Sequence, residues 1–114
     1  MRIPFEWLQA DWPAPANVRT ASTLRSGGVS AIPFDTLNLG DHVGDAPDAV
    51  RSNRQRIVQA LQLPNEPCWL NQVHGTRVVE ASEWQIPPQA DACIARRAGQ
   101  VCVVMTADCP PVLL

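Results

Sequence analysis

At 114 residues, the chain has the length of one domain, which could bury roughly two-thirds of its unfolded surface. Its 46% hydrophobic and 18% charged residues indicate a folded globular protein and exclude a disordered one. A net charge of −2 excludes the strongly basic surface with which many proteins bind nucleic acid or anionic membranes. We therefore expect no nucleic-acid or membrane partner.

The N-terminal residues 1–7 lack the apolar core and the cleavage site of a signal peptide. No run approaches the roughly 18 apolar residues of a membrane span. These features predict a cytoplasmic protein, in which cysteines stay reduced. The four cysteines form no CxxC pair, so we expect free thiols at Cys68, Cys93, Cys102 and Cys109.

Residues 1–17 predict an extended lead-in, and the alternating, β-branched residues 18–24 predict a strand. The following Arg25 and the pair Gly27-Gly28 allow two interpretations. One is a plain hairpin turn. The other is a concave row of backbone N–H groups that holds an anion beside Arg25.

The segment 31–44 predicts a long irregular loop, and loops of this length are often functional. Its polar candidates are Asn38 and His42, each with structural hydrogen bonding as the alternative. The clearest helix is predicted over residues 46–63, with Asp45 as its N-cap, and Pro64 ends it.

Four further strands are predicted, over residues 68–75, 77–81, 90–95 and 101–105. The last is continuously apolar, which is typical of a strand buried on both faces. One helix among several strands predicts the α+β fold class, with a mixed, largely buried sheet flanked by the helix. The chain stops on the apolar residues 112–114, whereas domain ends are usually polar. We therefore expect residues 1–114 to form a single domain that is the N-terminal part of a longer one.

Two reactive side chains follow apolar segments, an imidazole at His74 and a thiol at Cys109. Both are zinc ligands, and a catalytic zinc site needs three protein ligands. The same two residues would also suit a thiol nucleophile and its base. Spacing alone leaves both readings open, together with that of two unrelated buried residues.

The amino-acid sequence of these segments resembles that of the YfiH-like family, also called laccase-domain or polyphenol-oxidase proteins. The resemblance rests on Asn71-Gln72-Val73-His74-Gly75 and on Met105-Thr106-Ala107-Asp108-Cys109-Pro110-Pro111-Val112. It extends through residues 22–30, 37–40, 42–45, 53–54 and 90–92, and thus covers the chain from about residue 14.

The resemblance implies a zinc-dependent purine nucleoside phosphorylase that acts on inosine or adenosine with phosphate, and with adenosine deaminase activity. It implies His74 and Cys109 as zinc ligands, while the third, a histidine in a His-Ala-Gly-Trp-Arg-Gly motif, is expected beyond Leu114. Zinc would activate a water or polarise a substrate atom. His42 is not assigned as a substitute ligand, and the sequence does not give the oligomeric state.

The implied catalytic residues are Cys109, His74 and Asp108, with Asp108 as an orienting group, a proton carrier or a turn residue. Arg25 and Asn38 are the candidate phosphate and substrate contacts. Three alternatives stay open: a Cys/His thiol hydrolase, a copper polyphenol oxidase, and a non-catalytic fragment of the longer enzyme. Multicopper chemistry needs an imidazole-rich cluster, which two histidines do not supply, so copper is the weaker expectation.

Overall fold

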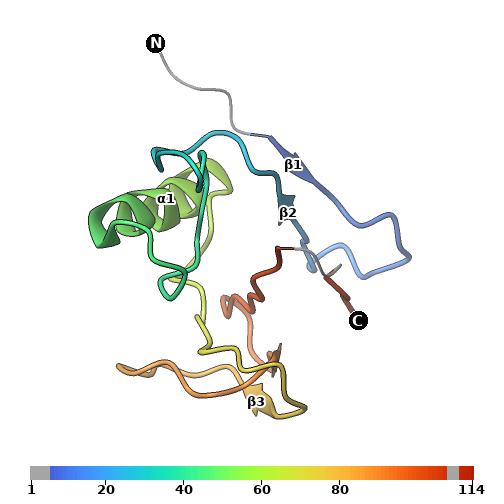
Figure 1. The fold of residues 1–114 in the computed structure, drawn as a ribbon. Coiled ribbons are helices and arrows are strands. Elements are labelled where there is room, and N and C mark those ends of the chain that lie inside the picture. Colours follow the sequence, from blue (N-terminus) through green and yellow to red (C-terminus); the bar gives the residue numbers. More distant parts are fainter. Residues whose placement is uncertain (1–5, 108–110) are drawn as a thin grey trace. The chain divides into compact units, whose positions relative to one another are not determined.

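A computed structural model describes residues 6–107 and 111–114, which divide into two compact units (Figure 1). The first unit contains residues 6–56 and 112–114, and the second contains residues 57–107 and Pro111. Among the described residues, one helix and small two-stranded sheets confirm the α+β class. None of the helices described is long and apolar enough to cross a membrane. That the chain forms a single domain stays a prediction.

The sheet of the first unit pairs β1 (Trp7–Leu8) with β2 (Ser22–Thr23) in antiparallel orientation. The predicted strand over residues 18–24 is therefore wrong over most of its length. The reason lies at Thr20, whose hydroxyl accepts the amide proton of Ala10 at 2.9 Å. A side-chain oxygen thus takes the place that a backbone carbonyl would hold in a longer ladder.

The helix α1 (Pro47–Ala60) lies within the predicted range, with proline at its first position. The N-cap assignment is wrong by one residue. The first carbonyl of the helical ladder is that of Ala46, which accepts the amide of Val50 at 3.2 Å. Asp45 instead binds the amide of Ala46 at 2.8 Å, immediately outside the helix. This leaves the other Asp45 oxygen available to the preceding loop.

The sheet of the second unit contains β3 (Val78–Glu80; Figure 1) and pairs it in parallel with β4 (Ala92–Ile94). In this pairing Val79 lies opposite Cys93. Both strands were predicted, with longer bounds. Parallel strands need a long connection, and here residues 81–91 supply it. The indole of Trp84 anchors this connection by donating to the carbonyl of Trp69 at 3.0 Å. The buried apolar side chains of the unit are Ile57, Leu61, Trp69, Leu70, Ala81 and Ala90.

The strands predicted over residues 68–75 and 101–105 are wrong. Each is irregular and holds only isolated bridges, Cys68 to Cys102 and Asn71 to Gln89. Nor is Val101–Met105 buried on both faces, because Cys102 is exposed and its neighbours are half-buried. The ladder stops because the side chain of Gln72 occupies both backbone hydrogen-bonding groups of Met105. The largely buried sheet is therefore absent from the described residues.

Candidate zinc and substrate site

His74 lies in a bend after the Asn71 bridge, with its backbone in the left-handed region at a φ of 60°. The backbone amides of Val73 and His74 donate to Oδ1 of Asp91 at 3.1 and 2.9 Å, and that of Gly75 donates to Oδ2 at 2.7 Å. Consecutive amides that converge in this way form an anion-binding nest, and here the anion is a side chain of the same chain. These hydrogen bonds, that of Gly75 foremost, hold the pKa of the Asp91 carboxyl below its usual range.

The His74 side chain is exposed, and its imidazole makes no hydrogen bond to the described part of the chain. The hydrogen bonds to Asp91 hold the His74 backbone, while its imidazole is exposed to solvent. The structure thus leaves the nitrogen atoms of His74 accessible, as both the zinc and the nucleophile–base readings require.

Gln72 joins the His74 bend to the segment that leads to Cys109. Its Nε2 donates to the Met105 carbonyl at 2.8 Å, and its Oε1 accepts the Met105 amide at 2.6 Å. The carboxamide thus binds both the backbone N–H and the backbone C=O of one residue. It replaces a neighbouring strand at that single position. The two segments that carry the family resemblance are therefore hydrogen-bonded to each other.

Asp108 and Cys109 lie outside the described residues, so their predicted roles stay predictions. Within residues 6–107 and 111–114, no three His, Cys, Asp or Glu side chains group as a metal site would require. Of the proposed zinc ligands only His74 is described. Imidazole and thiolate are donors that zinc accepts, and the accessible His74 ring fits that role.

Arg25 is 79% exposed on its side chain and is linked to Asp35, by Nε to the carbonyl at 3.2 Å and by Nη2 to the carboxylate at 3.6 Å. Gly27 has a φ of 100°, as a turn demands. The amides of Gly28 and Val29, however, donate to the side chains of Thr36 and Asn53. The glycine pair therefore does not offer these two amides to an external anion. Arg25 alone remains the predicted phosphate contact.

Asn38 has the structural role that was its alternative. Its Nδ2 donates to the Gly40 carbonyl at 3.0 Å and to Oδ2 of Asp45 at 3.1 Å, and its Oδ1 accepts the Gly40 amide. The same Asp45 oxygen accepts the Ser30 hydroxyl at 2.6 Å. These bonds lower the pKa of Asp45, that of Ser30 most. A substrate contact through Asn38 stays a prediction and would have to share these groups.

Asn53 holds this loop to α1 and is fully buried, with 0% exposure. Its Nδ2 donates to Ser30 Oγ and to the Asn38 carbonyl, both at 2.8 Å. One helical side chain thus satisfies three loop groups, because its Oδ1 also takes the Val29 amide. By contrast, His42 is exposed beside Asp41, with 3.6 Å between Nδ1 and Oδ1.

The cysteines described are all free thiols, as predicted for Cys68, Cys93 and Cys102. Burial, together with a hydrogen bond to Cys102, raises the pKa of the Cys93 thiol to about 12. A thiol with this pKa is protonated at neutral pH and is a poor nucleophile. Cys93 is therefore a poor candidate for a reactive thiol.

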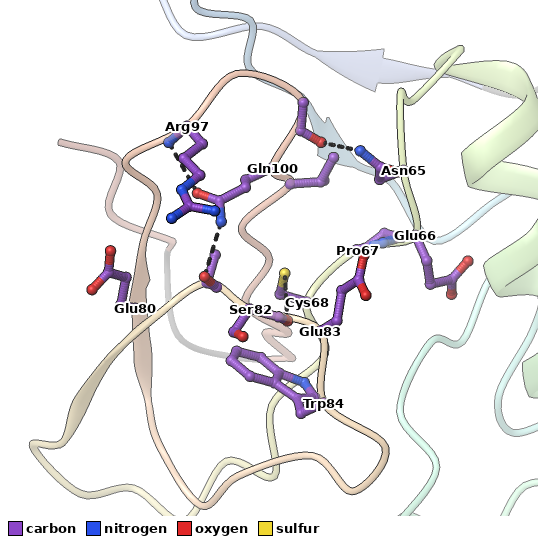
Figure 2. A pocket seen from close by; sticks show the side chains of 13 residues that line it. Asn65, Glu66, Pro67, Cys68, Glu80, Ser82, Glu83, Trp84, Arg97 and Gln100 are labelled. Atoms are coloured by element: carbon purple, nitrogen blue, oxygen red, sulfur yellow. Dashed lines mark hydrogen bonds between the residues drawn. The ribbon is translucent and has the colours of Figure 1, made fainter.

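A cavity of about 850 Å³ lies in the second unit and includes none of the predicted site residues (Figure 2). Its lining carries three carboxylates, Glu66, Glu80 and Glu83, and the guanidinium of Arg97, while Glu80 is paired with Arg96 at 3.2 Å. Two lining amides are already engaged, Gln100 with the Ala81 carbonyl and Asn65 with the Gly99 carbonyl (Figure 2). This excess of negative charge disfavours phosphate, so we do not place the phosphate site here.

Comparison with known proteins decides the family. The family model described as multi-copper polyphenol oxidoreductase laccase matches residues 19–114. The chain belongs to this family. The resemblance inferred from the two motifs is therefore confirmed, and among the relatives of this laccase-like family are proteins named YfiH.

The chain is 53% identical over 107 residues to purine nucleoside phosphorylase PA4543 of Pseudomonas aeruginosa. This alignment covers 94% of this chain and 43% of that protein. It is 50% identical over 103 residues to purine nucleoside phosphorylase YfiH of Escherichia coli, covering 90% and 42% respectively. The chain of this laccase-like protein thus spans about two-fifths of the length of the curated relatives it matches.

Solved structures of similar fold include those of the proteins NMB0706 and YlmD. Protein NMB0706 of Neisseria meningitidis is 52% identical, with a TM-score of 0.83 over 90% of this chain and 42% of that one. YlmD of Geobacillus stearothermophilus is 29% identical, with a TM-score of 0.81 over the same shares. The described architecture is therefore that of part of a laccase-like fold.

Gln72 and Asp91 lie within the family-like motifs, and neither was predicted to have a role of its own. Gln72 binds a residue 33 positions away, and Asp91 binds amides 16 to 18 positions away. The one available signal was an isolated carboxylate between two small residues, Ala90 and Ala92, at the start of a predicted strand. Such a position leaves the carboxylate free to reach a neighbouring loop.

Proposed function

We propose that this chain belongs to a zinc-dependent purine nucleoside phosphorylase that cleaves inosine or adenosine with phosphate, with adenosine deaminase as a second activity. The names of the relatives from Pseudomonas aeruginosa and Escherichia coli support the phosphorylase assignment. The substrates are accordingly a purine nucleoside and phosphate. Zinc and deamination rest on the family resemblance of the motifs.

The observation that carries the proposal is the double hydrogen bond between Gln72 and Met105. Gln72 precedes His74 by two residues, and Met105 precedes Cys109 by four. A link between the two segments so near to both residues supports a common site for the imidazole and the thiolate.

The residues of this chain would divide the work as follows. His74 and Cys109 hold the metal, a third histidine completes its shell, and bound zinc supplies a Lewis acid for the substrate. Arg25 contributes a positive charge for phosphate. Its guanidinium is exposed, so it can exchange the Asp35 carboxylate for the phosphate. Asp108 orients the site or carries a proton, and Asn38 contributes only by sharing its present hydrogen bonds.

The test is zinc content and phosphate-dependent release of hypoxanthine from inosine, both measured on the full-length protein. We expect about one zinc per chain, and loss of activity with a chelator that added zinc reverses. The Cys109→Ala and His74→Ala variants should each lose zinc, and their kcat/KM should fall at least ~100-fold. The matched controls are Cys93→Ala and His42→Ala, which should keep both.

Three results would overturn the proposal in distinct ways. Activity that ignores the chelator but is destroyed by alkylation of Cys109 would establish a thiol hydrolase. Zinc binding without phosphorolysis would leave a metal-binding module. A protein that binds copper and oxidises phenols would establish the oxidase instead.

A further inference from the structure

We propose that Asp91 is a positioning residue for His74, whose carboxylate fixes the backbone of the His74 bend and thereby the direction of the imidazole. The proposal rests on the proposed function, since it assigns Asp91 to the zinc site of which His74 is one ligand. Asp91 touches neither metal nor substrate in this assignment. It acts through the backbone of residues 73–75.

The first argument is the conformation at His74. A φ of 60° is uncommon for a residue with a side chain, and such residues persist where the surroundings hold them. The surroundings here are the Asp91 oxygens, which accept the amides on both sides of His74 as well as its own. Histidine thus adopts a conformation that glycine would adopt freely, at a position where the proposed zinc site requires an imidazole.

The second argument is the way in which Asp91 is itself held. The neighbouring Ala90 has 0% exposure, and its amide donates to the Asn71 carbonyl at 3.1 Å. The Asp91 amide donates to the Arg77 carbonyl at 3.1 Å, and β4 begins at the next residue. Asp91 is therefore fixed by backbone contacts on both sides. Through its carboxylate it restricts the backbone of the His74 bend in turn.

The third argument is the match between the group and its partners. Oδ1 faces the amides of Val73 and His74, and Oδ2 lies 2.7 Å from that of Gly75. Both oxygens must therefore be acceptors. A side chain that replaces either oxygen with a donor would meet a backbone N–H group head on.

The test compares Asp91→Asn with wild type in the full-length protein, and Asp48→Asn serves as the matched control. Asp48 lies on the exposed surface of α1, where its carboxylate binds Arg51 at 2.9 Å. We expect zinc affinity, measured against a competing chelator, to fall ~10- to 100-fold in Asp91→Asn and to stay unchanged in the control. The visible absorption of the Co²⁺-substituted protein should change in Asp91→Asn alone.

Hydrogen exchange in the metal-free protein gives a second readout. Exchange should speed up at the amides of residues 73–75 in Asp91→Asn, while the amides of β3 keep their wild-type rates. If Asp91→Asn does not fold, Asp91→Ser, which retains one acceptor, takes its place with the same expected direction.

The outcomes separate this proposal from the function on which it rests. Wild-type zinc affinity and an unchanged Co²⁺ spectrum in Asp91→Asn would overturn the role of Asp91 and leave the zinc enzyme intact. A wild-type protein that binds no zinc would overturn the proposed function, and with it the positioning role.

Discussion

Gly28 has no room for a side chain. A methyl group at this position would collide with the carbonyl oxygen of Thr36, with the Cα of Leu37 and with Oδ1 of the buried Asn53. Two of these are backbone atoms, and the third already binds the Val29 amide at 2.8 Å. The glycine is therefore required for the loop to pack closely against α1, whereas Gly27 is required for its positive φ.

We predict that Gly28→Ala lowers the free energy of unfolding by about 1–3 kcal/mol, because backbone atoms must move to admit the methyl group. Gly40→Ala is the matched control. A methyl group there would meet nothing closer than the Asn38 side chain at 3.6 Å, so its unfolding free energy should stay within about 1 kcal/mol of wild type. Denaturant unfolding measures both, and equal stability of the two variants would contradict the prediction.

At the scale of elements, α1 ends in a regular C-terminal cap that could not be predicted from the sequence. Gln62 has a φ of 52°, its amide donates to the Gln59 carbonyl at 3.2 Å, and the Leu63 amide donates to the Val58 carbonyl at 3.0 Å. These two bonds make a Schellman motif, in which glycine usually occupies the left-handed position. With glutamine there, the predicted helix ran on to Leu63 instead of ending at Ala60.

Gln62→Gly should raise the free energy of unfolding by about 1 kcal/mol, since glycine adopts the left-handed conformation without the cost that a side chain incurs. The control is Gln59→Gly inside the same helix, which should lower stability by about 0.5–1 kcal/mol. Thermal unfolding of both variants checks the pair. A loss of stability in Gln62→Gly would contradict the prediction. It would show that the Gln62 side chain stabilises the fold by more than its left-handed backbone costs.

Which elements could be predicted depended on how local their causes are. The helix follows from its own periodicity and from Pro47, and β3 and β4 follow from short β-branched or apolar runs. The run from Val101 to Met105 has the same composition, but its ladder is stopped by Gln72, a residue 33 positions away from Met105. Composition carries no information about such a partner.

The same distinction applies to the site. The motif around His74 predicts a site residue there, yet its left-handed backbone and its fixation by Asp91 depend on atoms that meet only in the folded chain. The suggested anion nest at Gly28 failed for the same reason. Its amides are taken by Thr36 and Asn53, which no local pattern connects with it.

At the scale of the molecule, two family names point to different chemistry. The family model is described as a multi-copper laccase, while relatives at 50% and 53% identity are named purine nucleoside phosphorylases. The composition of this chain bears on the choice. A multicopper oxidase gathers many imidazoles, and across roughly two-fifths of its relatives' length this chain supplies two histidines.

We therefore predict that the full-length protein, loaded with Cu²⁺, consumes oxygen with a phenol no faster than free Cu²⁺ does, because the two histidines of residues 1–114 are too few to build a multicopper cluster. The zinc-loaded protein should release hypoxanthine from inosine in the same buffer once phosphate is added. Oxygen uptake and purine release measured on one preparation make the comparison direct. A copper-dependent uptake above the free-ion rate that disappears in His74→Ala, but survives in His42→Ala, would mean that the His74 site serves oxidation after all.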